Sequence, residues 1–171
     1  MPRGPKAHGR TKAASYYYAG GKKIELAPAD DLVALDGRGL AKVSAEAREV
    51  VERAGRPLSE GIHLVEKAFL GDDAEVAAAG RLYPVFRSRG AVIVALPEVR
   101  IEDSRVGYQK KIGSWLRSHA GEAVVEKHSA DRVDVRPASG GDALGIANAL
   151  AEEVGPEMAQ VRFLRVTGRP V

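Results

Sequence analysis

The 171-residue chain carries 26 basic and 23 acidic residues, a net charge of +3, and contains no cysteine. The lack of cysteine excludes a disulfide framework and thiolate chemistry. No apolar run reaches the roughly 18 residues that a membrane-spanning helix needs, and the first residues lack the apolar segment of a secretory signal, so cytoplasmic residence is expected. The length allows a substantial core, in one domain or in two small packed units.

The positive charge is concentrated at the N-terminus. Residues 1–15 carry four of the 26 basic residues and no acidic residue, which leaves a net charge of −1 on the rest of the chain. This segment is rich in Pro, Gly, Lys and Arg, and we predict that it is a disordered basic tail. It either contacts nucleic acid or an acidic partner, or only increases solubility.

Regular structure is expected to begin at Tyr16. Three consecutive tyrosines are followed by a Gly-Gly turn and by residues 22–26, a pattern that favours a β-hairpin. The tyrosines either form a stacking platform for bases or peptides, or belong to one strand whose rings alternate between two faces.

Residues 16–90 are predicted to form a smaller, β-rich α+β unit. Ser44 caps a helix that ends near Ala54, with Val50 and Val51 on its inner face, and Gly55 is expected in a left-handed C-cap. Residues 72–79 form either a short helical turn or a loop. Strands are expected at residues 32–35, 62–65 and 82–86, the last paired as a hairpin with residues 91–96.

Residues 91–166 are predicted to form a second unit with the order strand, helix, strand, strand, helix, strand. The expected strands cover residues 91–96, 123–127, 132–136 and 158–166, and the expected helices cover residues 104–119 and 142–154. This βαββαβ order is that of a ferredoxin-like fold, in which two helices cover one face of a four-stranded antiparallel sheet. The fold class is therefore α+β, and the fold alone assigns no function.

Details of the two helices of this unit follow from their apolar stripes. In the first, Val106 is expected on the buried stripe and Trp115 at its edge, half buried. In the second, Asp142 is the N-cap, and Asn148 beside the stripe is expected to bond to backbone. Whether the two units share one continuous sheet through residues 91–96 stays open.

No catalytic arrangement is found in the sequence. The adjacent aspartate pairs point apart, Gly20-Gly21-Lys22 lacks the remainder of a phosphate-binding loop, and neither Ser129 nor Ser139 has a partnered histidine. The histidines, whose spacing fits no metal site, are His8, His63, His119 and His128. We therefore predict that the chain is not an enzyme and needs no cofactor or metal.

Two segments resemble the N-terminal prosegments of bacterial subtilisin-like serine peptidases. Residues 16–26, YYYAGGKKIEL, with DLVAL at 31–35, are similar to the opening of such prosegments. Residues 133–136, 142–150 and 157–164 are similar to their end, where a helix of the type ALxIANxL leads to a strand ending near AxPxF. This chain has Val161 where that pattern often has proline, and it lacks the Asp, His and Ser motifs of the peptidase domain. The resemblance implies a detached prosegment or a stand-alone relative acting in trans.

The resemblance also implies a mode of binding. Subtilase propeptides cover two surface helices of the peptidase with their sheet, and their C-terminal residues run extended through the substrate cleft, like an added strand. The matching tail here is Val166, Thr167, Gly168, Arg169, Pro170 and Val171, in which Pro170 would resist cleavage. The candidate contacts to the peptidase surface are Glu126, Asp131, Phe163 and Arg165. Of these, Asp131 either caps a helix of the peptidase or satisfies only its own turn.

The leading hypothesis is therefore a non-catalytic module that inhibits, or chaperones the folding of, a subtilisin-like peptidase. One alternative is an RRM-like nucleic-acid-binding module with a basic arm, which needs aromatic residues on its central strands. The strands at 91–96 and 158–166, expected to be central, offer only Phe163. The other alternative is an adaptor that recruits a protein by its sheet edge, and a free edge would also permit a dimer.

Overall fold

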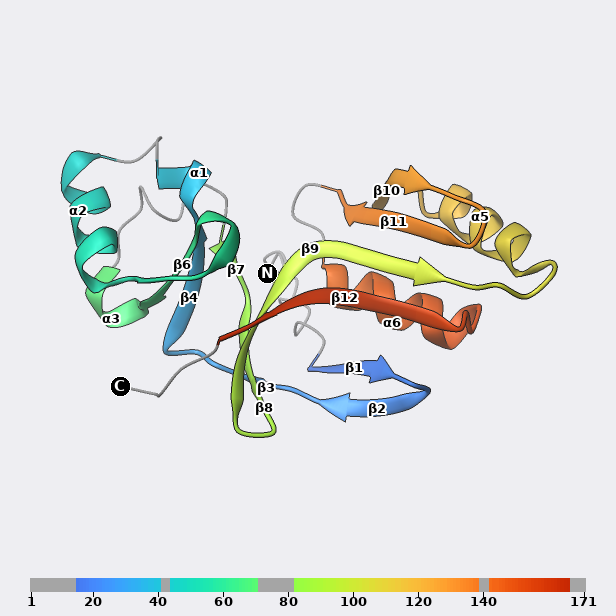
Figure 1. Ribbon diagram of the computed structural model, residues 1–171, viewed down its shortest axis with the longest axis horizontal. Helices are drawn as coiled ribbons and strands as arrows, with labels where there is room; N and C mark the ends of the chain where they lie inside the picture. Colours follow the sequence, from blue (N-terminus) through green and yellow to red (C-terminus); the bar gives the residue numbers. More distant parts are fainter. Residues whose placement is uncertain (1–14, 41–43, 71–81, 139–141, 167–171) are drawn as a thin grey trace, which may run out of the picture.

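The computed structural model describes residues 15–40, 44–70, 82–138 and 142–166, and the structural statements below concern these residues. The chain has an α+β fold with antiparallel sheets (Figure 1). The predicted hairpin is confirmed, because β1 (Tyr16–Ala19) pairs antiparallel with β2 (Lys22–Glu25). Gly20 and Gly21 form its two-residue turn. Both have a positive φ, the backbone conformation that such hairpin turns favour.

The first unit contains a four-stranded antiparallel sheet in the order β5-β6-β4-β7. Its longest helix among the described residues, α2, runs from Ala45 to Ala54, as predicted from Ser44, whose carbonyl accepts the N–H of Arg48. The remaining elements are β4 (Leu32–Asp36), α1 (Gly37–Leu40), β5 (Arg56–Pro57), a 3-10 turn at Ser59–Gly61, β6 (Ile62–Glu66), α3 (Lys67–Leu70) and β7 (Leu82–Tyr83). Residues 72–79, predicted as a helical turn or loop, lie outside the described residues.

The second unit has the strand order β10-β11-β9-β12, again antiparallel throughout. The elements are β9 (Ala91–Glu102), α5 (Tyr108–Ser118), β10 (Ala123–His128), β11 (Arg132–Pro137), α6 (Ala143–Glu153) and β12 (Met158–Arg165). The first half of β9 also pairs with β8 (Val85–Ser88), and β8 pairs with β3 (Ala27–Pro28). One six-stranded sheet therefore joins strands from both halves of the chain through β9 (Figure 1).

The two units repeat one strand order. If the four strands of each unit are numbered along the chain, both sheets have the order 2-3-1-4. These strands are β4, β5, β6 and β7 in the first unit and β9, β10, β11 and β12 in the second. An Asp-x-Arg sequence also stands at the end of the first strand of each unit: Asp36 is the last residue of β4, and Asp103 directly follows β9. In both, the carboxylate accepts the backbone N–H two residues on and the guanidinium of that arginine.

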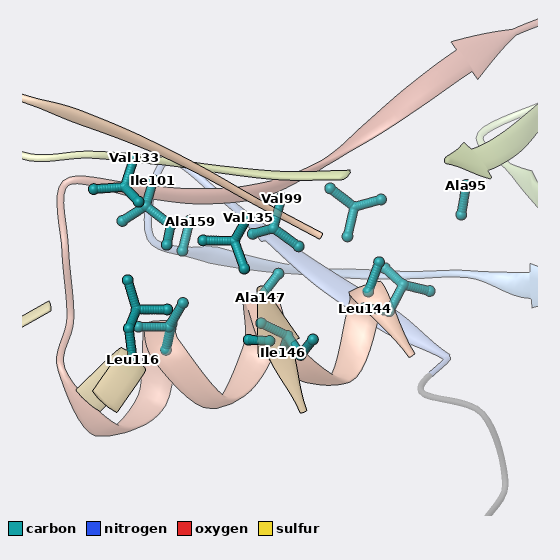
Figure 2. Close-up of a cluster of buried hydrophobic side chains, with 14 of the residues drawn as sticks. Ala95, Val99, Ile101, Leu116, Val133, Val135, Leu144, Ile146, Ala147 and Ala159 are labelled. Atoms are coloured by element: carbon teal, nitrogen blue, oxygen red, sulfur yellow. The ribbon is translucent and has the colours of Figure 1, made fainter. Parts of the chain in front are cut away.

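Helices α5 and α6 pack on one face of the second sheet. In Figure 2, Val99 and Val135 lie over α6, and Val133 lies at the end of the sheet near Leu116 of α5. Because strand side chains alternate, Ile101, Ala159 and Val161 lie on that same face of the sheet. They form one buried cluster with residues of the two helices, Ile112 and Leu116 of α5 and Leu150 of α6. Asp142 caps α6 as predicted, its carboxylate accepting the N–H of Leu144 at 3.0 Å.

Several predicted element boundaries are wrong. Strand β9 continues through Pro97 to Glu102, because the register with β12 is shifted near this point and Pro97 has no paired partner in either ladder. Helix α5 begins only at Tyr108, after Gly107 with φ 88°, so Val106 is fully exposed and not on the buried stripe. The strand expected at 82–86 is interrupted at Pro84 and contributes to two sheets.

Three further residues differ from the prediction, two in burial and one in backbone conformation. Trp115 is buried, not half buried, and its indole N–H donates to Glu153. On α2, Val51 is buried but Val50 is exposed. Gly55 does not have a positive φ, so it is not a left-handed cap, and its glycine identity has a steric reason.

Candidate functional site

The face of the second sheet opposite α5 and α6 is the candidate site, and we call it the open face. Its side chains alternate with the buried residues of β9, β11 and β12, so strand geometry places them together on the other side. They are Glu98, Arg100, Glu102, Val124, Glu126, Lys127, Arg132, Asp134, Arg136, Met158, Gln160 and Arg162. The set is almost entirely charged or polar, unlike the apolar helix face.

Most charged side chains of the open face form ion pairs. Asp134 lies between two arginines, with Arg132 at 2.7 Å and Arg100 at 3.5 Å. The hydrogen bonds from Arg132 lower the pKa of Asp134 despite its partial burial, so this carboxylate is ionised at neutral pH. At the β10 edge, Arg136 and Glu126 are 3.3 Å apart. The face thus presents ordered positive and negative groups rather than one sign of charge.

One pair connects the open face to the first unit. The guanidinium of Arg162 is 3.2 Å from Glu98 and also donates to Glu60, which follows α2 in the chain. Its pKa is raised, chiefly by the hydrogen bonds to Glu60. This contact holds one end of the open face against the first unit.

Two adjoining hollows shape the surface. One, of about 530 Å³, lies over the open face and includes Arg100, Asp134 and Gln160. The other, of about 610 Å³, lies between the open face and the first unit and includes Asp36 and Tyr83. Glu98 and Glu126 line both, so the hollows form one continuous depression.

Asp36, at the end of this depression, has a structural role. It is 3% exposed, and its oxygens accept from Arg38 and, at 2.7 Å, from the hydroxyl of Tyr83. The hydrogen bonds from Arg38 hold its pKa far below the usual range of a carboxyl group. A carboxylate that is held ionised with its oxygens already bonded is a poor general base, so we assign Asp36 to the structure of the depression.

In the first unit, the side of the sheet that faces away from α2 packs against the second unit. Ala34 and Ile62 lie on the side of that sheet away from Val65, which contacts Gly55 at the end of α2. They pack with Val94 and Leu96 of β9 in a second buried cluster. The second unit therefore covers the helix-free side of the first sheet. It does so with Val94 and Leu96, which lie on the same side of β9 as Glu98, so in the described chain only the charged part of that side, the open face, stays uncovered.

The structure distributes the predicted site residues over several surfaces. Glu126 lies on the open face, and Asp131 lies in the exposed β10–β11 turn, where its carbonyl accepts the N–H of Asp103 at 2.9 Å. Phe163 lies on the other side of β12, with its ring 4.9 Å from that of Tyr17. Arg165 is exposed at the end of β12, opposite Ile93.

The predicted tail begins where β12 ends. The N–H of Val166 donates to the carbonyl of Val92 at 2.9 Å, which is the last described bond of the chain to the sheet. The remaining predicted tail residues, Thr167, Gly168, Arg169, Pro170 and Val171, lie outside the described residues.

Sequence reasoning missed most of the open face. The signal was present, because Arg132, Asp134 and Arg136 alternate with valines, as do Glu98, Arg100 and Glu102 with apolar residues. Such alternation indicates one polar and one buried face. Only the pairing of the strands shows that the two charged sets lie side by side.

The strand order and the side chains of the open face also bear on the RRM-like nucleic-acid alternative. The central strands of the second unit are β9 and β11, so the prediction that residues 158–166 form a central strand is wrong. None of the described side chains on the open face is aromatic, and its four arginines each pair with a carboxylate. The three tyrosines form a strand: Tyr17 packs on Phe163, and Tyr16 and Tyr18 bond Glu152 of α6.

Within the described ranges, no group of three or more His, Asp or Glu side chains is arranged to hold a metal ion. No described helix combines the length and the apolar character that crossing a membrane requires. Comparison of the chain with protein-family models, with curated proteins and with solved structures gave no match.

Proposed function

We propose that the chain is a non-catalytic, propeptide-like module that binds a subtilisin-like serine peptidase and inhibits it or chaperones its folding. The proposal includes a ferredoxin-like fold for residues 91–166 and, from the repeated strand order, for the first unit as well. The observation that carries it is the free open face of a sheet whose helices both lie on the other side. The resemblance of residues 16–35 and 133–164 to subtilase prosegments names the partner.

The open face would be the contact surface for the peptidase. In the first unit the equivalent face already packs against protein, which supports the use of this face for docking. Carboxylates such as Glu126, which is half exposed and only 3.3 Å from one arginine, can exchange that pair for the N–H groups at a helix N-terminus of the partner. Arg136 would then pair with an acidic side chain of the peptidase.

The C-terminal segment would occupy the substrate cleft. Strand β12 borders the open face and leads directly into residues 167–171, which the resemblance identifies as the cleft-binding tail. An added strand gains affinity from backbone hydrogen bonds and selectivity from side-chain pockets. The proposal therefore has two contacts, a face and a tail, that variants can separate.

The test is titration of the full chain into a subtilisin-like peptidase while peptide hydrolysis is followed. We expect stoichiometric loss of activity, abolished by deletion of residues 167–171. Arg136→Glu should weaken inhibition, because it places two carboxylates together on the open face. Arg53→Glu, on the exposed side of α2, is the matched control and should inhibit normally. Full peptidase activity at a large excess of intact chain would refute the proposal.

An RRM-like nucleic-acid module or a sheet-edge adaptor is the alternative. Nucleic-acid binding through the basic tail would fall steeply as salt rises and would be lost on removal of residues 1–15. Inhibition of a peptidase by the open face would show neither property. Cytoplasmic residence stays a prediction from the sequence alone.

A further inference from the structure

A second hollow lies on the helix side of the sheet, away from the open face. It has a volume of about 490 Å³, lies between α5 and β10, and includes Leu116, Ala123, Val125 and Val133 in its lining. Val125 is 46% exposed although its partner across the ladder, Val135, is buried. An apolar wall is thus left open to solvent beside an edge strand.

Strand β10 is that edge, since among the described strands it pairs only with β11 (Figure 1). At one end of the β10–β11 ladder the N–H of Ser129 donates to the backbone carbonyl of Arg132. At the other end the N–H of Ala138 donates to the backbone carbonyl of Glu122. Bonded and non-bonded pairs alternate in an antiparallel ladder. With the bulge between Val125 and Lys127, this alternation turns the backbone N–H and C=O of Val125 and His128 outward.

The outward-facing residues and the hollow lie on the same side. The side chains of Val125 and His128 both line the hollow. Paired residues in a ladder have their side chains on one face. A strand added to β10 would therefore direct the side chain opposite Val125 into the space beside Leu116.

The lining of the hollow specifies what would enter. The Nε2 of Gln109 donates to the carbonyl of Asp103, but its Oε1 is buried without a hydrogen-bond partner. That oxygen has no accessible surface, so the ligand is selected by the volume and the largely apolar lining of the hollow, which favour a large apolar side chain such as an indole. Arg117 and His128 lie at the hollow, and none of its described lining residues is a carboxylate, which favours an acidic neighbour.

We propose that the outer edge of β10 is a strand-addition site for an extended peptide segment of a partner protein. The segment places an indole side chain between α5 and β10 and an acidic side chain, two residues away, beside Arg117. Backbone bonds to Val125 and His128 give affinity, and the hollow gives selectivity. This site does not depend on a peptidase, and it stays accessible when the open face is covered.

The test uses the full chain, isotope-labelled, and a capped octapeptide of alternating valine and threonine with a central tryptophan and an aspartate two residues further on. We expect saturable shifts of the backbone amides of Val125 and His128. Val125→Lys should weaken binding at least about tenfold, equivalent to about 1.4 kcal/mol. Val50→Lys, at a valine of similar exposure on α2, should bind normally. Control peptides with lysine for aspartate, or with methylated backbone nitrogens, should bind more weakly than the parent.

Several results would overturn the proposal. These are the absence of saturable shifts at millimolar peptide, equal binding by Val125→Lys, or shifts located at β12 instead of β10. Concentration-dependent shifts of the β10 amides without peptide, together with a doubled mass in solution, would assign the edge to a second copy of this chain. Each result is independent of whether a subtilisin-like peptidase is inhibited.

Discussion

The Asp-x-Arg pairs organise the chain at the scale of single residues. Asp103 is buried and accepts the N–H of Arg105 at 2.9 Å and its guanidinium at 2.7 Å. It also accepts the N–H of Glu157 at 3.1 Å, just before β12. One carboxylate therefore turns the chain away from β9 and holds the start of β12 beside it.

We expect Asp103→Asn to destabilise the fold by about 1–3 kcal/mol, because an amide cannot replace all the acceptor bonds and leaves Arg105 without its counter-charge. Asp31→Asn is the control, since Asp31 pairs with Arg87 at the surface. Exposed pairs contribute little, so this change should have a much smaller effect. Urea unfolding at neutral pH measures both. Equal effects would show that burial of the carboxylate is not what matters.

The same pair predicts a pH dependence. The pKa of Asp103 is lowered, first by its hydrogen bonds with Arg105, so the folded state favours the ionised form. A lowered folded-state pKa contributes stability above the usual Asp pKa of about 3.9, and this contribution is lost as pH falls through the lower folded value. The stability gap between the native chain and Asp103→Asn should be constant from pH 7 to 5 and close as acid is added. A gap that is already lost between pH 7 and 5, where Asp103 is ionised in both states, would contradict this account.

At the scale of elements, a close approach explains the end of α2. A Cβ at Gly55 would lie 2.3 Å from the carbonyl oxygen of Val51 and 3.3 Å from Val65. The carbonyl of the last helical turn thus leaves no room for a side chain at Gly55, and Val65 of β6 lies close on the same side. Gly55 serves packing rather than backbone freedom, because its φ is not positive.

Gly55→Ala should thus destabilise the fold by about 1–3 kcal/mol, as overpacking against backbone does. Gly121→Ala is the matched control, because a Cβ there meets nothing within 4 Å and φ is not positive. It should be neutral or stabilise slightly, by less than about 1 kcal/mol. Thermal unfolding followed by circular dichroism compares the two. A harmless Gly55→Ala would mean that the helix end can shift.

The existence of most elements could be predicted from local patterns, and their limits could not. Apolar spacing identified α6, and Asp142 marked its start, because a cap is a local signal. Pro97 was read as a strand end, but a register shift between β9 and β12 accommodates it, and register is a property of two strands. The open face was missed for the same reason. Its charges come from four strands, and only their pairing brings Arg100 beside Asp134.

At the scale of the whole molecule, two units with one strand order are joined through side chains of β9. Strand β9 belongs to the second sheet, yet its first half carries Val94 and Leu96 into a cluster with Ala34 and Ile62 of the first unit. Arg162 adds a polar contact between the units through Glu60. Neither unit can lose this cluster without exposing apolar surface of the other, so they should unfold together.

The single tryptophan tests this cooperativity. Trp115 lies on α5 in the second unit, whereas Ile62 lies on β6 in the first. Ile62→Ala should cost about 2–5 kcal/mol and lower the unfolding midpoint by about 2–4 °C for each kcal/mol. We expect Trp115 fluorescence and circular dichroism to shift together, and Val50→Ala, at an exposed site, to leave both nearly unchanged. The opposite outcome would be that, in Ile62→Ala, Trp115 fluorescence keeps the midpoint of the unchanged chain while the dichroism curve splits into two steps. That would show that the second unit folds alone and that the cluster around Val94 only positions its open face.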